Sequence, residues 1–453
     1  MRNRKKWRIL LLGVVCLLPM HILPVQAEEY WPEGPQIEGE SAIVMEVSTG
    51  TVLYEKNSHE HSYPASITKI MTSLLAVENS GLDEKVTFSQ DAVYKTEGSG
   101  IWRDIDEVMT MRECLYGLML ESANECGYAI AEHTGKSYDN FITMMNDKAR
   151  ELGCKDTHFN NPHGLPDEDH WTCAYDMALI SREALQNDIF RMIVNTRRYT
   201  IPPTNKHSEE TYLSNHHMML NNWKGEERYL YDYCIGGKTG YTSVAGSTLA
   251  TFAEKDGMTL ICVVMKEKSP NHYLDTRTLF DYCFENYQLW NVAENEKKYT
   301  EGAQELKIFE NEESFIGLNQ KGCIVLPVAV NFEDAVPKIS ETHNDDQVVG
   351  RIEYTYANRN VGGTDIEITG AKVTEFNFQK KMEIVPMPEK KVIRINIKYV
   401  VIGFVSLIFL IGLGFGIYHL VDNFYLIRYK FESRRQQRQK FKEIKGRRRH
   451  RRK

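Results

Sequence analysis

The chain has 453 residues and a formal net charge of −7, with 42% hydrophobic and 26% charged residues. This length allows two or three domains with a substantial core. Residues 1–27 carry +5 and residues 422–453 carry +11, so residues 28–421 carry −23. Such an acidic body argues against a nucleic-acid partner.

The first 27 residues have the pattern of a secretory signal peptide. Basic residues within positions 2–8 precede an apolar run from Ile9 to Leu18, and Ala27 supplies a small residue before an acidic pair. A basic segment, an apolar segment and a small residue in this order predict cleavage after Ala27. We therefore expect an exported protein.

Two strands and a helix are predicted next. Residues 41–56 indicate two strands joined by a turn at Gly50. A helix entered through Pro64 is predicted because apolar residues then recur with the spacing of one buried face, at Ile67, Ile70, Met71, Leu74 and Leu75. Ser66 lies in the first turn of this helix, and Lys69 lies one turn later on the same side.

Ser66 and Lys69 have the spacing of a nucleophile and its base. A serine hydroxyl is a weak nucleophile until a base within about 2.6–3.2 Å takes its proton. Lysine can be that base only when burial or neighbouring cations lower its pKa from about 10.4. Backbone N–H groups at the start of the helix can stabilise an oxyanion. Because S-x-x-K occurs in helices by chance, the pair needs support from the rest of the chain.

Ser122, Ala123 and Asn124 interrupt a helical pattern that covers about residues 111–120. The Ser122 hydroxyl can relay a proton between Lys69 and a leaving amine. The carboxamide of Asn124 can hold Lys69 or an amide of a substrate. Ser122 and Asn124 can alternatively cap a helix.

Lys238, Thr239 and Gly240 come just before a hairpin that is predicted over residues 247–265. Lys238 adds a second cation, which can bind a substrate carboxylate and lower the pKa of Lys69. Thr239 can donate a hydrogen bond to the same carboxylate. Gly240 allows a substrate backbone to approach the edge of the strand.

The last third of the chain changes in character. After a helix predicted near residues 278–287, residues 300–390 contain short β-rich runs that predict a separate all-β domain. Residues 399–421 contain no Lys, Arg, Asp or Glu, and as a helix of about 34 Å they would span a bilayer. Residues 422–453 hold 14 Lys or Arg and 3 Asp or Glu. The positive-inside rule therefore predicts a single-pass protein of the cell membrane with a basic cytoplasmic tail against anionic headgroups, and an external catalytic domain.

Cysteines and histidines do not form recognisable frameworks. Eight cysteines lie between the signal peptide and the span, at Cys114, Cys126, Cys154, Cys173, Cys234, Cys262, Cys283 and Cys323. They are sparse, irregularly spaced and mostly in apolar segments, so we expect buried free thiols rather than disulfides. His158, His163, His170, His216 and His217 fit no metal-ligand spacing. The sequence predicts no metal and no cofactor.

The three motifs in this order are the signature of penicillin-binding proteins and class A β-lactamases. Over residues 35–390 the chain resembles the low-molecular-weight penicillin-binding proteins that are serine-type D-alanyl-D-alanine carboxypeptidases. The segments Gly164-Leu165, His170 to Asp176 and Gly236 to Thr242 look like that family's own. The resemblance implies an α/β (α+β) penicillin-binding/β-lactamase-like transpeptidase fold in a catalytic domain over residues 28–295. It also implies that the all-β domain carries the catalytic domain away from the membrane.

The resemblance implies a role for each motif residue. Ser66 would form the acyl ester, Lys69 would accept its proton, Ser122 would be the second catalytic serine and Lys238 would bind substrate. The backbone N–H groups of Ser66 and Tyr241 would form the oxyanion hole. The substrate would be a peptidoglycan stem pentapeptide, and β-lactams, which mimic that peptide, would acylate Ser66.

Two features depart from the family pattern. Relatives often end in an amphipathic helix on the membrane, whereas this chain has a true span and an arginine-rich tail. Relatives often bind the terminal carboxylate with an arginine whose place here holds His272, before Tyr273. Arg277 is nearby but is expected to point elsewhere. The substitution concerns substrate affinity rather than acylation.

Three alternatives stay open at this point. Endopeptidase or transpeptidase activity on crosslinks would use the same residues. A β-lactamase needs a carboxylate that activates the deacylating water, and Asp167 or Glu168 is a candidate, although the glutamate-x-x-leucine-asparagine pattern is missing. A catalytically silent wall-binding protein would not need complete motifs. The sequence does not indicate an oligomeric state.

Overall fold

The computed structural model describes residues 30–222, 224–297, 316–340 and 348–368. The predicted signal peptide (1–27), the predicted span (399–421) and the basic tail (422–453) lie outside these residues. Within the described ranges, no helix is both long enough and apolar enough to cross a bilayer.

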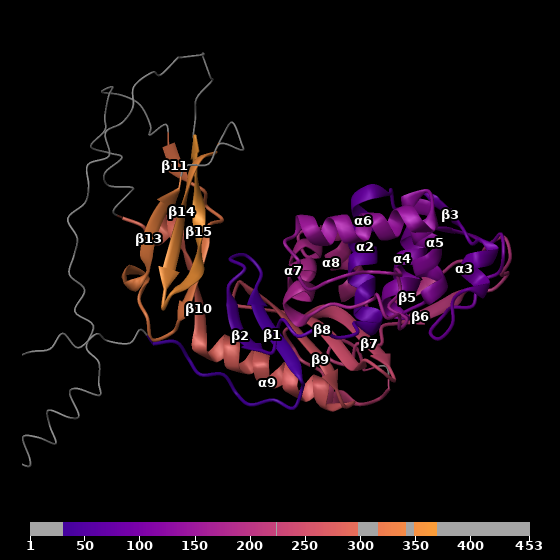
Figure 1. Cartoon of the computed structure of the whole chain (residues 1–453), viewed down its shortest axis with the longest axis horizontal. Coiled ribbons are helices and arrows are strands. Elements are labelled where there is room, and N and C mark those ends of the chain that lie inside the picture. Colours follow the sequence, from indigo (N-terminus) through magenta and orange to yellow (C-terminus); the bar gives the residue numbers. More distant parts are fainter. Residues whose placement is uncertain (1–29, 223, 298–315, 341–347, 369–453) are drawn as a thin grey trace, which may run out of the picture. The chain divides into compact units, whose positions relative to one another are not determined.

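A five-stranded antiparallel sheet organises the larger part of the chain (Figure 1). Its order is β2-β1-β9-β8-β7, with bounds β1 Ser41–Glu46, β2 Val52–Lys56, β7 Cys234–Thr242, β8 Gly246–Lys255 and β9 Met258–Glu267. The two hairpins expected from the sequence, β1-β2 and β8-β9, are both present. Strand β7, which carries the Lys238 motif, is an edge strand and pairs on one side with β8.

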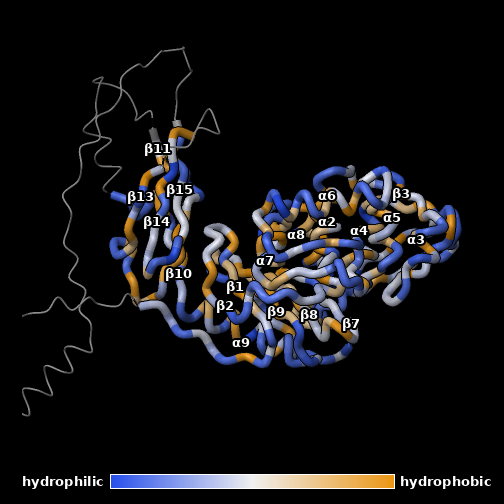
Figure 2. Tube along the Cα trace, viewed as in Figure 1, coloured by the Kyte–Doolittle hydropathy of each residue, from blue (hydrophilic) through white to orange (hydrophobic). Residues whose placement is uncertain are grey.

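Both faces of this sheet are buried, and its side chains alternate between two cores. On β1, Ile43 and Met45 join the core on one face, whereas Ala42 and Val44 join the core on the other. Such double burial produces a nearly continuous apolar strand, which is also the pattern of β9. Figure 2 shows hydrophobic positions along these strands and the helices beside them.

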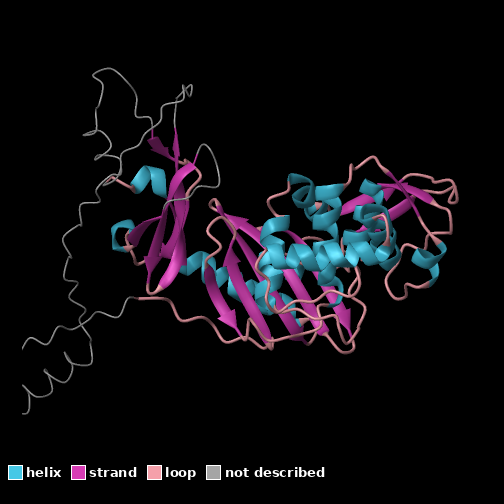
Figure 3. Cartoon of the chain, turned by 45° about the horizontal axis from the view of Figure 1, so that its top comes forward, coloured by secondary structure: helices cyan, strands magenta, loops and turns pink. Residues whose placement is uncertain are grey.

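Helices cover the two faces (Figure 3). The larger core contains residues from helices α2, α4, α5, α7 and α8, and helix α9 packs in the other core. The helices are η1 Ala65–Thr68, α2 Lys69–Asn79, α3 Gln90–Tyr94, α4 Met111–Leu120, α5 Asn124–Gly135, α6 Tyr138–Glu151, α7 Ala174–Ala184, α8 Asp188–Asn195, η2 Glu227–Tyr229, α9 Asn271–Asn286 and α10 Val292–Asn295. Two small hairpins pair β3 (Lys85–Thr87) with β4 (Val108–Thr110), and β5 (Arg198–Ile201) with β6 (Thr211–Ser214).

The closing helix is longer than the sequence predicted. It begins at Asn271 rather than near Thr278, directly after Pro270, so that it includes His272 and Arg277. The polar residues Asn271, His272 and Asp275 concealed the start of the apolar face. Helix α9 is followed by β10 (Tyr287–Asn291) without an intervening loop.

A second antiparallel sheet follows, in the order β10-β12-β15-β14-β13 with β11 paired to β15. Its strands are β11 Ile316–Leu318, β12 Cys323–Pro327, β13 Val336–Ser340, β14 Val348–Tyr356 and β15 Arg359–Ile368, with the short η3 Phe332–Asp334. Ile324, Leu326, Ile352 and Tyr354 form part of its own core. The β-rich character expected after residue 300 is therefore present. Strand β10 belongs to this sheet although it lies inside the predicted catalytic domain, so the boundaries 28–295 and 300–390 stay predictions.

Candidate active site

Ser66 lies in a tight turn between the edge of the sheet and a buried loop. This turn is the short 3₁₀ helix η1, which leads directly into α2. Thr248 on β8 donates to the carbonyl of Pro64 at 2.8 Å and so ties this turn to the sheet. Gly164 approaches from the other side, where a Cβ would lie 1.8 Å from the carbonyl oxygen of Ala65. Only glycine permits this approach, and its φ of +90° is also one that glycine adopts without strain.

Lys69 is fully buried and its amine lies beside Ser66. The distance from Lys69 Nζ to Ser66 Oγ is 3.0 Å. Two further oxygens accept hydrogen bonds from the same nitrogen, Asn124 Oδ1 at 2.7 Å and the carbonyl oxygen of His163 at 2.6 Å. The expected nucleophile and base are therefore brought together.

The surroundings of Lys69 favour the neutral amine. Burial lowers the pKa of Lys69 well below its ordinary value, and the nearby cation Lys238 lowers it further. A neutral amine has two N–H donors and one lone pair. If Asn124 and His163 accept the two N–H groups of a neutral amine, its lone pair is left for the contact with Ser66 Oγ at 3.0 Å. An amine in that state could accept the serine proton.

Ser122 and Asn124 lie in the junction between α4 and α5, and both are buried. Ser122 adopts a left-handed φ of 59°, and its Oγ has no hydrogen-bond partner among the residues described. Asn124 places Oδ1 on Lys69, and its Nδ2 donates to the carbonyl of Glu97 at 2.5 Å. The cap of α5 is Ala123, and no side chain caps this helix. The alternative role of Ser122 and Asn124 as helix caps is therefore wrong.

Lys238, Thr239, Gly240 and Tyr241 follow one another on the edge strand β7. The Lys238 side chain is only 2% exposed, and Nζ donates to the carbonyl of Thr239 at 2.9 Å. Burial lowers the pKa of Lys238 to about 7. Tyr241 is 69% exposed, so the strand passes from a buried cation to an accessible surface within four residues.

Gly240 brings β7 against the nucleophile. A Cβ on Gly240 would lie 2.8 Å from the backbone nitrogen of Ser66 and 2.3 Å from Thr248 Oγ1. The nitrogen of Ser66 is thus held next to the strand that continues into Tyr241. The oxyanion hole expected from the N–H groups of Ser66 and Tyr241 stays a prediction, and this proximity is consistent with it.

The loop of residues 160–170 supplies contacts that the sequence analysis did not assign. Its His163 carbonyl accepts from Lys69, and its Pro162 carbonyl accepts from Thr72 at 2.6 Å. The ring of His170 accepts from the backbone N–H of Asn160 at Nδ1, so Nε2 donates to Thr68 Oγ1 at 2.9 Å. Two of these contacts use backbone carbonyls, which leave no mark on residue type. The only available signal was that a buried lysine needs acceptors nearby.

His272 and Arg277 both lie on α9, and neither offers an exposed positive charge to a substrate. His272 is 5% exposed, and burial lowers its pKa to about 4, so it is neutral at pH 7. Arg277 donates to the carbonyls of Leu230 and Arg228, at 2.6 and 3.0 Å, as the expectation that it points elsewhere requires. Of these three residues, Lys238 is the one whose positive charge acts on Lys69.

The carboxylates considered for a β-lactamase lie on the outside of the 160–170 loop. Asp167 accepts from the backbone N–H of Asp169 at 2.9 Å, and Glu168 is exposed.

The eight cysteines are all free thiols, as expected, and six of them are buried.

An α/β domain with a serine on a helical turn, a buried lysine beside it and a second lysine on an edge strand defines a serine acyl-transfer protein of the penicillin-binding type. The family model for D-alanyl-D-alanine carboxypeptidases (peptidase S11) matches residues 28–269. The chain belongs to this family.

Similarity to individual proteins agrees with this assignment. The chain is 34% identical over 289 residues to D-alanyl-D-alanine carboxypeptidase DacF of Bacillus subtilis, covering 62% of this chain and 70% of DacF. It is 27% identical over 376 residues to DacA of Escherichia coli, covering 78% of this chain and 87% of DacA. Among solved structures, the DD-transpeptidase of Streptomyces K15 aligns with a TM-score of 0.51 and 29% identity, over 56% of this chain and 99% of that one.

Proposed function

We propose that this protein is a serine-type D-alanyl-D-alanine carboxypeptidase that removes the terminal D-Ala from peptidoglycan stem pentapeptides through an acyl-enzyme on Ser66. Membership of the family and the similarity to DacF and DacA support this activity. The observation that carries the proposal is the amine of Lys69, 3.0 Å from Ser66 Oγ with its other two contacts on oxygen acceptors.

In the acylation step, Ser66 Oγ attacks the carbonyl carbon of the peptide bond between the two D-Ala residues. The Ser66 proton moves to Lys69, and the carbonyl electrons move to the oxygen, where backbone N–H groups stabilise the charge. When this intermediate collapses, the C–N bond breaks. The proton passes from Lys69 through the Ser122 hydroxyl to the leaving amine, and D-Ala departs.

In the deacylation step, water attacks the ester carbon and gives its proton to Lys69. The bond to Ser66 Oγ breaks, and Ser66 recovers a proton from Lys69. The atoms and protons of one turnover therefore balance with one water consumed. Asn124 acts as a positioning residue throughout, because it holds the amine that moves each proton.

Substrate binding is assigned to the edge strand. An extended peptide can add to the edge of β7, and Gly240 keeps that strand close to the backbone nitrogen of Ser66. The ammonium of Lys238 and the hydroxyl of Thr239 would hold the terminal carboxylate, and Tyr241 would present its N–H to the oxyanion. His272 is buried and neutral, so it cannot replace an arginine as a charged ligand.

The acyl-enzyme can also be taken up by an amine instead of water, which would make the protein a transpeptidase. The likeness to a DD-transpeptidase of known structure is the observation that favours this second candidate. The two reactions share the first step and differ in the acceptor, so a single assay separates them.

The full chain, purified in detergent, is incubated with fluorescent penicillin and with diacetyl-Lys-D-Ala-D-Ala, with and without a D-amino acid acceptor. The proposal predicts stable labelling, release of D-Ala and loss of both in Ser66→Ala. A product that carries the acceptor identifies the transpeptidase. Rapid loss of label identifies a β-lactamase, and the absence of both label and D-Ala would refute catalysis.

We also propose export and anchoring in the cell membrane, with the catalytic domain outside and the tail inside. The signal-peptide pattern, the apolar run of residues 399–421 and the basic tail support this arrangement. Protease added to intact cells should digest the external domain and leave an epitope on the tail protected. Digestion of that epitope in intact cells would contradict the topology.

A further inference from the structure

A second cluster of reactive side chains lies shortly before the Ser66 turn. Asp156 is placed between two histidines, with one carboxylate oxygen for each ring. His59 Nδ1 lies 3.2 Å from Oδ2, and His61 Nε2 lies 3.2 Å from Oδ1. The histidine side chains are 57% and 53% exposed, so the cluster is open to ions from solvent.

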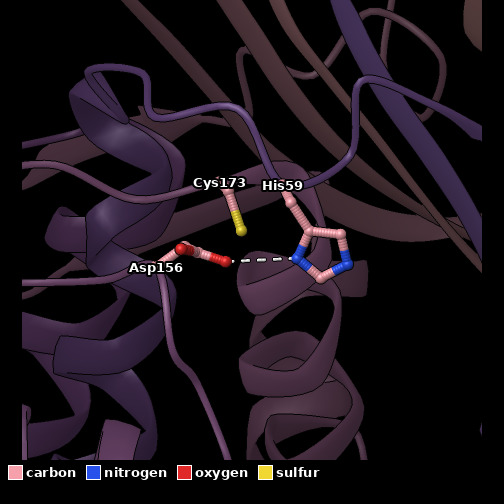
Figure 4. A group of neighbouring side chains, drawn as sticks. All are labelled: His59, Asp156 and Cys173. Atoms are coloured by element: carbon pink, nitrogen blue, oxygen red, sulfur yellow. Dashed lines mark hydrogen bonds and ion pairs between the residues drawn. The ribbon is translucent and has the colours of Figure 1, made fainter.

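A buried thiol completes the cluster. One ligand atom each from His59, Asp156 and Cys173 lie within 4.8 Å of one another. Figure 4 shows the Cys173 sulfur close to this pair, and its dashed line joins an Asp156 oxygen to the nearer nitrogen of the His59 ring. Asp176 aligns the other two groups, because its carboxylate accepts from the Asp156 N–H at 2.7 Å and its own N–H donates to Cys173 Sγ at 3.4 Å.

Stacking fixes the two imidazole rings. His59 stacks on Tyr175 with ring centroids 4.6 Å apart, and His61 stacks on Trp171 at 4.3 Å. The two chain segments that carry these rings are also joined by an isolated β-bridge, in which Ser62 and Thr172 exchange backbone hydrogen bonds of 2.7 and 3.0 Å. The positions of the candidate ligands are therefore set by packing and backbone contacts beyond the cluster.

We propose that His59, Asp156 and Cys173 bind a Zn²⁺ ion, with His61 holding the second oxygen of Asp156 and water in the fourth position. An imidazole, a carboxylate and a thiolate are ligands that suit zinc, whereas calcium and magnesium take oxygen ligands. The carboxylate and the thiolate together balance the charge of the ion. The contact of His61 with Asp156 is of the kind that orients first-layer ligands.

Another group of potential ligands, Asp104, Glu107 and His207, does not support the same inference. Glu107 is already paired with Arg103 at 3.1 Å and accepts from Thr204 at 2.7 Å. A cation there would compete with the guanidinium. No such cation lies against the Asp156 cluster among the described contacts.

The proposed ion would stabilise the fold rather than take part in acyl transfer. It would join residues 59–61 to residues 156–173, two segments about a hundred positions apart in the sequence. Residue 61 is four positions before Ala65, where the Ser66 turn begins. Zinc should therefore raise the melting temperature of the protein and leave the rate of penicillin labelling unchanged.

The test uses the untagged full chain in detergent after removal of metals by a chelator. Zn²⁺ is titrated by calorimetry, and Co²⁺ is titrated as a spectroscopic probe that reports a thiolate ligand by a charge-transfer band. We expect one saturating equivalent and this band in the wild type. Cys173→Ser should lose the band, and both Cys173→Ser and His59→Gln should bind Zn²⁺ at least about 100-fold more weakly. His61→Gln should reduce the affinity for Zn²⁺ about 10- to 100-fold.

The matched control is His133→Gln, because His133 makes an isolated surface contact of 2.7 Å with Glu84. It should bind both metals like the wild type. Retained penicillin labelling shows that each variant is folded. Absence of saturable binding, absence of the charge-transfer band, or titrations of Cys173→Ser and His59→Gln that match the wild type would each overturn the proposal.

Discussion

Replacing Asn124 by aspartate tests whether Lys69 acts as a neutral base. The change places a negative charge where the carboxamide oxygen lies 2.7 Å from Lys69 Nζ. An opposite charge at this range raises the pKa of an amine by about 1–3 pH units. Lys69 would then keep its proton to higher pH, and acylation of Ser66 would begin at higher pH by the same amount.

The alanine variant separates charge from geometry. Asn124→Ala removes the acceptor without adding a charge, and the loss of a hydrogen bond by a buried group costs about 1–3 kcal/mol. If this cost falls on the transition state, acylation slows about 5- to 150-fold, without the shift to higher pH that the aspartate produces. The two variants should therefore differ in the shape of their pH profiles.

The assay is the second-order rate of labelling by fluorescent penicillin between mildly acidic and alkaline pH. Asn195→Asp, an exposed position on α8, is the control for added charge and should follow the wild type. An acidic limb of Asn124→Asp that coincides with the wild type, or that lies at lower pH, would refute the assignment of Lys69 as the base.

Three further predictions follow from contacts around the site. The KM for a peptide with a free terminal carboxylate should rise as the pH passes about 7, because burial lowers the pKa of Lys238 to about 7 and its charge is lost there. This pH dependence should disappear for a peptide amide and for Lys238→Ala. A Lys238→Ala variant with the pH dependence of the wild type would exclude Lys238 as the carboxylate ligand. The protein should lose stability as the pH falls from about 6.5 towards 3, because burial lowers the pKa of His170 to about 3 and the unfolded chain takes up the proton first; thermal melts of His170→Gln should show a weaker dependence, and an equal slope would contradict the role of His170. Gly240→Ala should slow penicillin labelling by about 10-fold or more, since its Cβ would lie 2.8 Å from the Ser66 nitrogen; stopped-flow labelling at the wild-type rate would show that β7 does not approach Ser66 so closely.

The sequence alone predicted those parts of the site that depend on the spacing of residues within one helical turn. Ser66 and Lys69 are three residues apart on a helical turn, so their proximity follows from helix geometry alone. The convergence of Asn124 and Lys238 on Lys69 is a long-range contact, which became predictable only because the three motifs occur in a recognised order.

The remaining features depend on backbone and tertiary structure. The third contact of Lys69 is the carbonyl of His163, and any residue type supplies a carbonyl. Gly164 was noted as part of a family segment, but its contact with the carbonyl of Ala65 requires two loops in their folded positions. The contact of His59 and His61 with Asp156 joins segments that are far apart in sequence, so the histidine spacing gave no signal of it.

The most direct test of the central claim is the protonation state of the Lys69 side chain. The full chain is prepared with lysine labelled at the Cε carbon, and the Lys69 signal is identified by its loss in Lys69→Arg. Titration by NMR should show that this amine loses its charge well below the ordinary range of lysine, because burial and Lys238 both lower its pKa. A Lys69 signal that stays charged and titrates near the ordinary value of about 10.4 would contradict the account.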